Sequence, residues 1–253
     1  MELQKTKDIS YALKTIEGHF PAAFRPVASP RKTAPQATGY RQVRIDPLTS
    51  PVLLGYLKDR GILPEIAKKV CKEVHFQNKG KWYFAVGFAN RSGGYEIRNK
   101  YLKGSISPKE ITHVQNGSDH CIVVEGFMDY LSYLTLKAMH PGGGQSKGNA
   151  PDYIVLNSVS NVGKAIPVLK EYKSALCLLN NDPAGRQAFQ QMAEAGCPVR
   201  DKSDCYREYN DLNDYLLGKK MSQENKTDSP SVSHVNRSMQ KSRSEKAWKI
   251  ISE

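Results

Sequence analysis

Residues 118–218 constrain the fold most, because short apolar runs alternate there with helix-forming stretches. The runs at 121–124, 153–157 and 175–179 predict strands, and a weaker run at 198–201 predicts a fourth. Helices are expected after these strands at 127–139, 163–172, 184–195 and 212–217. A strand that is apolar throughout is buried on both faces, so this order predicts an α/β fold with a four-stranded parallel sheet between helices.

Acidic residues follow three of these predicted strands. Glu125 ends the first strand and Asp129 comes one helical turn later, whereas Asp182 follows the third strand and Asp211 and Asp214 follow the fourth. Parallel strands present their carboxyl ends at one edge of the sheet, so these acids are expected to gather there. Carboxylates brought together repel one another unless cations lie between them, and oxygen ligands favour Mg2+ or Mn2+.

Each aspartate also has a purely structural interpretation. Asp129 in a first helical turn interacts favourably with the helix dipole. Asp182 precedes a proline and is a candidate N-cap, as is Asp211 before the last helix. Glu125 has no obvious capping role at the end of a buried strand, and Gly126 after it permits a tight turn or the close approach of another group. The three clusters taken together favour a metal site.

Three motifs carry a resemblance to a known family: "VVEGFMDYLS", "LLNNDPAGRQA" and "NDLNDYL", in this order and each after a predicted strand. They resemble the Toprim domain that bacterial primases, topoisomerases and some repair nucleases share, over about 118–218. The resemblance implies a four-stranded parallel sheet and catalytic roles for Glu125, Asp129 and Asp182. It also implies a Mg2+ or Mn2+ site formed by Glu125, Asn180, Asp182 and Asp211.

Asn180 departs from the family pattern, which usually has an aspartate at this position. An asparagine offers a neutral carbonyl oxygen in place of a charged one. The substitution predicts weaker metal binding, with one tight site where relatives hold two or more, and it puts catalytic activity in question. The alternative is that the other acids compensate and the change has no effect.

The segment before this region is strongly basic. Residues 41–117 carry fourteen basic and six acidic groups, a net charge of +8, whereas residues 118–218 carry nine and twelve, a net charge of −3. A basic surface beside an acidic pocket suits a polyanion held next to bound cations. Helices at 51–58 and 64–72 and strands at 73–76, 82–90 and 93–99 predict a smaller α+β subdomain, with Gly61 ending the first helix in a left-handed conformation.

The stretch "WYFAVGFANRSGGYEIRNKYLKGS" looks like the basic subdomain that precedes Toprim in bacterial (DnaG-type) DNA primases. Residues 41–218 as a whole resemble small primase-like proteins of Bacteroides mobile elements. This resemblance implies that template or incoming nucleotide binds at a set of four residues: Arg98, Asn99, Lys100 and Lys103. The alternative for these residues is a solvated edge strand.

Three aromatic residues in the same stretch have two interpretations. Trp82, Tyr83 and Tyr95 either stack on nucleobases or pack in the core of the subdomain. We favour the core for all three.

The remaining segments predict little ordered structure. Residues 1–40 are expected to form an extension or linker, and 219–253 a disordered basic tail with a short helix near 247–251. The glycine-rich stretch 141–150 lacks phosphate-loop spacing and is expected to be a flexible loop. The cysteines lack zinc-ligand spacing, so no zinc is expected, and Cys121 and Cys177 are expected to be small buried apolar residues. A cytoplasmic protein without membrane contact is predicted.

The function predicted from the sequence is that of a primase-like nucleotidyltransferase. It would use a divalent metal to join ribonucleotides on single-stranded DNA, in DNA replication or mobile-element transfer, with a replicative helicase or mobile-element proteins as possible partners. One alternative is a metal-dependent Toprim nuclease that uses the same acids on water. The other is a non-catalytic nucleic-acid-binding protein with a degenerate metal site.

Overall fold

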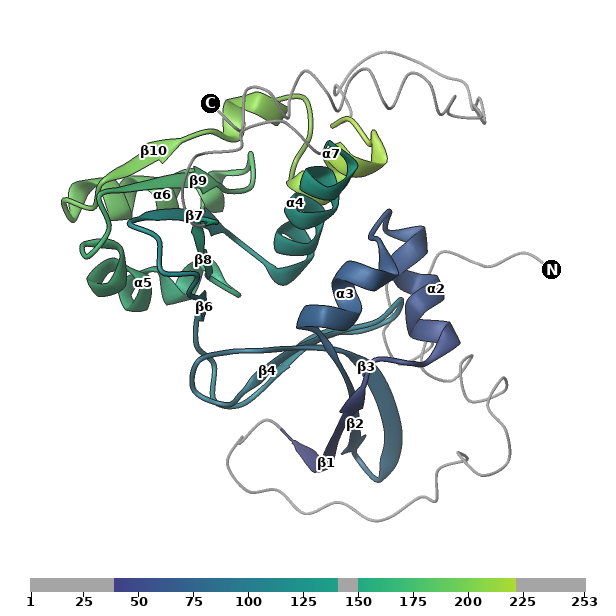
Figure 1. Cartoon of the computed structure of the whole chain (residues 1–253). Helices are drawn as coiled ribbons and strands as arrows, with labels where there is room; N and C mark the ends of the chain where they lie inside the picture. The colour runs from purple at the N-terminus through teal and green to yellow at the C-terminus, as the bar shows by residue number, and fades with distance from the viewer. Residues whose placement is uncertain (1–38, 141–149, 222–253) are drawn as a thin grey trace. The chain divides into compact units, whose positions relative to one another are not determined.

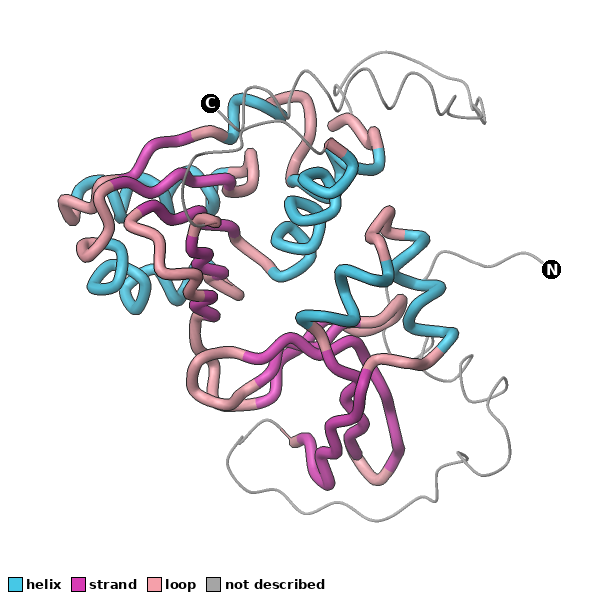
Figure 2. Tube along the Cα trace, in the orientation of Figure 1, coloured by secondary structure: helices cyan, strands magenta, loops and turns pink. Residues whose placement is uncertain are grey.

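A computed structural model describes residues 39–140 and 150–221, which form two compact units (Figures 1 and 2). Within the described residues, the first unit comprises 39–57 and 67–109, and the second comprises 58–66, 110–140 and 150–221. The predicted N-terminal linker up to residue 38, the glycine-rich loop at 141–149 and the tail from 222 lie outside the described residues.

The first unit contains a five-stranded sheet with the order β1-β2-β3-β4-β5, in which all neighbours are antiparallel. Its strands are β1 (Tyr40–Pro47), β2 (Lys72–Asn78), β3 (Lys81–Ala89), β4 (Tyr95–Arg98) and β5 (Lys103–Ile106). Helices α2 (Pro51–Asp59) and α3 (Pro64–Val70) lie between β1 and β2 in the sequence. One face of the sheet carries a core of Val74, Phe76, Ala85 and Ile97, all fully buried.

Both predicted helices and the three predicted strands of this unit are confirmed, but β1 and β5 were not predicted. Both are edge strands, and most of the side chains of β1 are exposed. An exposed edge strand needs no regular apolar alternation, so its sequence gives little signal.

The second unit contains a sheet with the order β10-β9-β7-β8-β6. Its strands are β6 (Thr112–Val114), β7 (His120–Val124), β8 (Asp152–Val155), β9 (Ser174–Leu178) and β10 (Val199–Asp201). The four strands β7 to β10 are parallel, as the apolar runs predicted, whereas β6 pairs antiparallel with β8 at the edge. A three-residue strand gives too short a pattern to be recognised, and β6 lies before the predicted domain border at 117/118.

Helices cover both faces of this second sheet, as expected for a parallel sheet. They are α4 (Phe127–Met139), α5 (Val162–Leu169), α6 (Pro183–Glu194) and α7 (Leu212–Leu217). Residues of α5 and α6 pack with Cys121 and Cys177, which are buried free thiols as predicted. On the other face, α4 places Tyr130 and Tyr133 against Tyr153 of β8. None of the helices in the described part of the chain could span a bilayer.

The segment between α2 and α3 packs within the second unit. Gly61 has a φ of 71° and its N–H donates to Lys58 O at 2.9 Å, which confirms the predicted left-handed helix end. A Cβ on Gly61 would lie 3.3 Å from the Leu216 side chain of α7. The N–H of Leu63 donates to Thr135 Oγ1 of α4 at 3.4 Å. Residues 58–66 are thus anchored to α4 and α7.

Candidate metal and nucleotide site

The carboxyl ends of β7, β8 and β9 lie side by side at one edge of the second sheet. Val124 and Leu178 are the last register partners of β7 and β9, and the N–H of Leu156 donates to Val124 O at 3.0 Å. Glu125 is therefore one residue beyond the sheet, and Asn180 is two residues beyond it on the neighbouring strand. Paired strands lie about 4.8 Å apart, so the first and second motifs are adjacent in space.

The loop after β9 is held by the start of α6. Asp182 is the N-cap of α6, and its Oδ1 accepts the N–H of Gly185 at 2.8 Å. The backbone of Gly185 approaches the loop so closely that a Cβ there would lie 2.1 Å from Asn180 O. Only glycine fits this contact, so the turn that carries Asn180 and Asp182 is fixed by the glycine of the motif.

Asn181, which the sequence analysis passed over, joins this loop to the segment that precedes α7. Its N–H donates to Asn210 O at 2.7 Å. Its Nδ2 lies within hydrogen-bonding distance of three carbonyl oxygens, those of Ser203 at 3.4 Å, Tyr206 at 3.2 Å and Tyr209 at 2.9 Å. These contacts bring the second and third acidic motifs together. No short-range pattern predicts them, because the acceptors lie more than 20 residues away.

The third motif begins α7 with two aspartates. Asp211 is the N-cap, and its Oδ1 accepts the N–H of Asp214 at 2.6 Å. Burial, and after it the negative charge of Asp211, raises the pKa of Asp214, while Lys219 and Arg60 act in the opposite direction. The two carboxyl groups are therefore close enough to influence each other's ionisation.

Asp129 lies in the first turn of α4, at 7% exposure, and its Oδ2 accepts the N–H of Gly126 at 3.1 Å. Gly126 itself is extended, with a φ of −130°, so no left-handed turn requires a glycine there. A Cβ would nevertheless lie 3.3 Å from Asp129 Oδ2, which is a tight contact. Burial and then the charges of neighbouring acids, Asp129 first, raise the pKa of Tyr206 well above its ordinary value. Asp211 is another of those acids, so the first and third motifs both lie near this phenol.

Asn213 holds α7 against α4 and was also missed. It is fully buried, and its Nδ2 donates to Ser132 Oγ at 2.9 Å and to Arg60 O at 2.8 Å. An amide inside the apolar stripe of a short helix is the signal that could have identified it, since a buried polar group needs partners. Asn213 thereby fixes the helix that carries Asp211 and Asp214.

The structural interpretation of Asp129, Asp182 and Asp211 is thus confirmed, since each makes a cap or first-turn hydrogen bond. This does not exclude a ligand role, because a carboxylate has two oxygens and each bond uses one. The predicted donors are all oxygens, which suits Mg2+ or Mn2+.

The predicted ligands do not, however, form a preorganised metal-binding cluster. Among residues 39–140 and 150–221, no group of three or more His, Cys, Asp or Glu side chains is arranged to hold a metal ion. Mg2+ commonly binds through one or two carboxylates together with water and substrate phosphates. The acidic edge, by which we mean the carboxyl end of the second sheet with Glu125, Asp182 and Asp211, fits that mode of binding.

In the first unit, the predicted nucleotide-binding residues surround β4 and β5. Arg98 pairs with Lys103 across the two strands, and Lys100 Nζ lies 5.9 Å from the centroid of the Tyr101 ring. The Asn99 amide is engaged within the turn, because Nδ2 donates to Phe84 O and Oδ1 accepts two backbone N–H groups, each bond being 2.9 Å. Arg98, Lys100 and Lys103 remain the groups suited to phosphate.

Glu96 lies on the same sheet face as Arg98, two residues before it on β4. Burial raises its pKa to about 7, against the opposing effects of Lys109 and Lys103. This basic surface therefore contains a carboxyl group that changes charge near neutral pH.

The three aromatic residues separate into two groups. Tyr83 and Tyr95 pack against the core of the first unit, as favoured, and Tyr83 stacks with Phe76 at a centroid distance of 5.8 Å. The prediction was wrong for Trp82, which is 43% exposed. Its position on β3 alternates with Tyr83, so it points to the opposite face of the sheet.

Comparison with known families assigns each unit a different match. Residues 122–216 match a family described as Toprim-like, and together with the observed parallel sheet this defines the second unit as a Toprim-like α/β fold. Residues 42–107 match a family described as Domain of unknown function (DUF8464). No significant match was found among curated proteins.

Among solved structures, the chain is similar to the primase fragment of the bacteriophage T7 primase-helicase protein. The identity is 17%, the TM-score is 0.48, and the match covers 75% of this chain and 80% of the other. It is also similar to the zinc-binding and RNA polymerase domains of the Aquifex aeolicus primase, at 16% identity and a TM-score of 0.47, over 68% of this chain and 54% of the other. Similarity at this level supports no conclusion about activity.

Proposed function

We propose that the chain is a primase-like nucleotidyltransferase that joins ribonucleotides on a single-stranded DNA template. The observation that carries the proposal is the meeting of three acid-bearing loops at the carboxyl edge of the second sheet, within the Toprim-like region. Toprim domains in general bind divalent metals, and carboxylates grouped at a strand edge suit a reaction between two phosphate-bearing substrates.

Each acid has a proposed role in this reaction. Glu125 is the essential carboxylate, and Glu125, Asn180, Asp182 and Asp211 are the proposed metal ligands. Mg2+ or Mn2+ bound there supplies charge neutralisation for the triphosphate and lowers the pKa of the attacking 3′-hydroxyl. Asp129 is a supporting acid that fixes the turn after Glu125 through the Gly126 N–H.

The first unit is proposed to bind the nucleic acid. Arg98, Lys100 and Lys103 supply positive charge for template or nucleotide phosphates. The Asn99 amide positions this surface by closing the turn between β4 and β5. The proposed substrates are accordingly single-stranded DNA and ribonucleotides.

A second candidate function is nucleic-acid binding without catalysis. Asn180 favours it, because a neutral amide lowers the charge available to a metal ion. The capping bonds of Asp182 and Asp211 favour it as well, since both explain these residues without any metal.

The products of one incubation distinguish the candidates. The protein is mixed with single-stranded DNA, ribonucleotides and either Mg2+ or Mn2+. Short RNA products support the primase, and degradation of the DNA in the absence of nucleotides identifies a nuclease. Salt-sensitive DNA binding with neither product supports the non-catalytic protein and contradicts the proposal.

A further inference from the structure

Trp82 lies on an open part of the first sheet that the proposed nucleotide-binding residues do not include. Its side chain is 43% exposed, although a tryptophan in a folded unit is usually largely buried. The register places Trp82 opposite Gln77 of β2, and Gln77 opposite Arg41 of β1. Residues directly opposite one another share a face, so Arg41, Gln77 and Trp82 form one row across three strands.

A β-bulge brings a second arginine onto this face. Arg41 pairs with Gln77 and Arg44 pairs with His75, so two residues of β1, Gln42 and Val43, lie opposite one residue of β2. Gln42, within the bulge, has a φ of 50°. Without the extra residue, two positions three apart would point to opposite faces; with it, Arg41 and Arg44 point to the same face.

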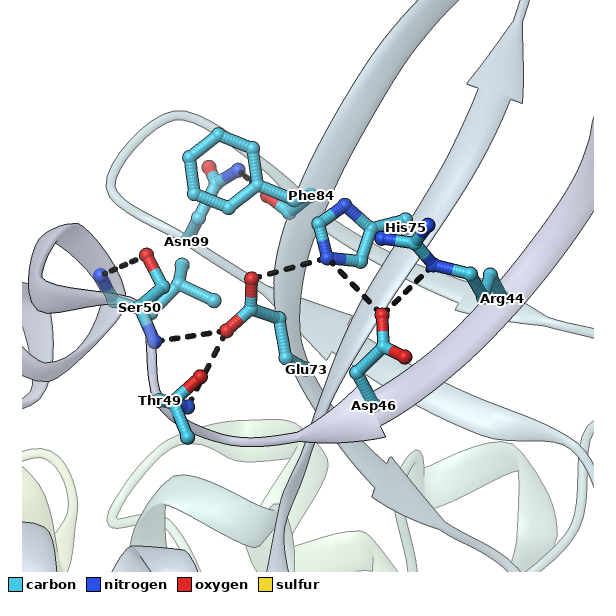
Figure 3. A network of polar contacts seen from close by, with 9 residues as sticks. Arg44, Asp46, Thr49, Ser50, Glu73, His75, Phe84 and Asn99 are labelled. Carbon is cyan, nitrogen blue, oxygen red and sulfur yellow. Dashed lines mark hydrogen bonds and ion pairs between the residues drawn. The ribbon is translucent and has the colours of Figure 1, made fainter.

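Arg44 is oriented by a chain of polar contacts (Figure 3). Its Nε donates to Asp46 Oδ2 at 2.8 Å, and His75 Nε2 lies 3.5 Å from the same oxygen and 3.0 Å from Glu73 Oε1. Glu73 Oε2 accepts the backbone N–H of Ser50 at 2.9 Å. The contact uses Nε, so the terminal nitrogens of the Arg44 guanidinium keep donors for another group, and the side chain is 69% exposed.

The charge around Trp82 is positive. Lys79 lies in the β2–β3 turn beside it, and residues 40–45 and 74–85 contain no aspartate or glutamate. Asp46 and Glu73, the two acids in the contacts that orient Arg44, lie opposite each other on β1 and β2 and further from this turn. An exposed indole among cationic side chains is complementary to a nucleobase flanked by phosphates.

We propose that Trp82, Arg41, Arg44 and Lys79 form a stacking site for single-stranded nucleic acid. An unpaired base stacks on the Trp82 indole, and the arginines and Lys79 bind the adjoining phosphates. A duplex keeps its base faces covered, so the exposed indole favours a single strand. Arg98 and Lys103 lie on the same sheet face, opposite Val86 further along β3, but they are not part of this site, which does not depend on the proposed catalysis.

Intrinsic fluorescence tests the site directly. The sequence contains two tryptophans, Trp82 and Trp248, so Trp248→Phe leaves Trp82 as the only tryptophan, which is excited selectively at the red edge of the absorption band, where tyrosine does not absorb. This variant is titrated with an oligothymidylate of about 12 nucleotides in EDTA. The titration is then repeated with a double variant that carries Trp248→Phe and Glu125→Gln. Saturable quenching in both is the expected result. Loss of primer synthesis would then leave this result unaffected, so the two proposals fail separately.

Variants and a matched control complete the test, with affinity measured by anisotropy of a labelled oligonucleotide. Trp82→Leu is expected to weaken binding about 10-fold. Arg44→Glu is expected to weaken binding and to lower the salt dependence. Lys72→Glu makes the same charge change on β2, but Lys72 shares the parity of Val74 and lies on the other face, so little change is expected.

Three results would overturn the proposal. The first is oligonucleotide binding without quenching. The second is a loss from Lys72→Glu as large as that from Arg44→Glu, which would mean diffuse attraction to a basic unit. The third is equal quenching by a duplex of the same length. A duplex has no unpaired base to stack on the indole, so its quenching would have another cause.

Discussion

The Asn181→Ala substitution removes the amide that joins the second and third acidic motifs. Asn181 Nδ2 has two hydrogens and three carbonyl acceptors, at 2.9, 3.2 and 3.4 Å, so we count about two hydrogen bonds. Each contributes roughly 1 kcal/mol, and carbonyls that lose their donor in a partly buried site add a further penalty. The free energy of unfolding is therefore expected to fall by about 2–3 kcal/mol.

Urea denaturation followed by circular dichroism measures this loss. The midpoint is expected to decrease with little change in slope, because the substitution alters contacts and not the surface exposed on unfolding. In the folded variant, Mn2+ affinity is expected to fall as well, since the segment leading to Asp211 is no longer held beside Asp182.

Asn180→Ala is the matched control one position earlier. It is expected to weaken Mn2+ binding with a stability change under about 0.5 kcal/mol, in the range of ordinary surface substitutions. An Asn181→Ala variant as stable as the wild type would refute the positioning role. Equal stability losses in the two variants would show that the loop as a whole is sensitive and that Asn181 has no special part.

Three further substitutions have clear expected outcomes. Burial raises the pKa of Glu96 from 4.5 to about 7, so the folded state holds this proton more tightly than the unfolded state does. Protonated Glu96 therefore stabilises the fold most below pH 4.5, and this stabilisation is lost as the pH rises through about 7. The negative charge that appears over the same range should also weaken DNA binding. Glu96→Gln should flatten DNA affinity between pH 6 and 8, and an unchanged profile would contradict this. Gly185→Ala should cost about 3 kcal/mol in thermal unfolding, because its Cβ would meet the Asn180 carbonyl. Asn180→Asp should tighten Mn2+ binding about tenfold by calorimetry, and an unchanged affinity would refute the weak-site idea.

The elements that surround the acidic edge could be predicted because each has a strong local pattern. Helix α4 begins and ends at the predicted residues, as does α7, and the four apolar runs form the parallel strands. Apolar periodicity and strand length are local properties, so a single sequence contains them.

The contacts that hold the site could not be predicted, because they join distant segments. The hydrogen bonds of Asn181 reach acceptors 22 to 28 residues away, and Asn213 Nδ2 reaches Arg60 across 153 residues. Neither side chain stands out by type, since asparagine is common in loops and at helix ends. The acids, in contrast, were recognisable from their order along the chain.

The exposed position of Trp82 was mispredicted for a related reason. An aromatic residue in a strand is buried or exposed depending on which face of the sheet its side chain lies on and what covers that face. Here the face depends on the register with β2, and Arg44 joins Arg41 on it only through the bulge in β1. A bulge of one residue in an exposed edge strand leaves no pattern in the sequence.

The central claim is that Glu125 serves nucleotidyl transfer at the acidic edge, and primer synthesis tests it most directly. Wild type, Glu125→Gln and the exposed-surface control Glu171→Gln are incubated with single-stranded DNA, ribonucleotides and Mn2+, and the products are resolved by length. We expect short RNA from the wild type and from Glu171→Gln, and none from Glu125→Gln. Equal synthesis by Glu125→Gln, or no synthesis by a folded, DNA-binding wild type, would contradict the claim.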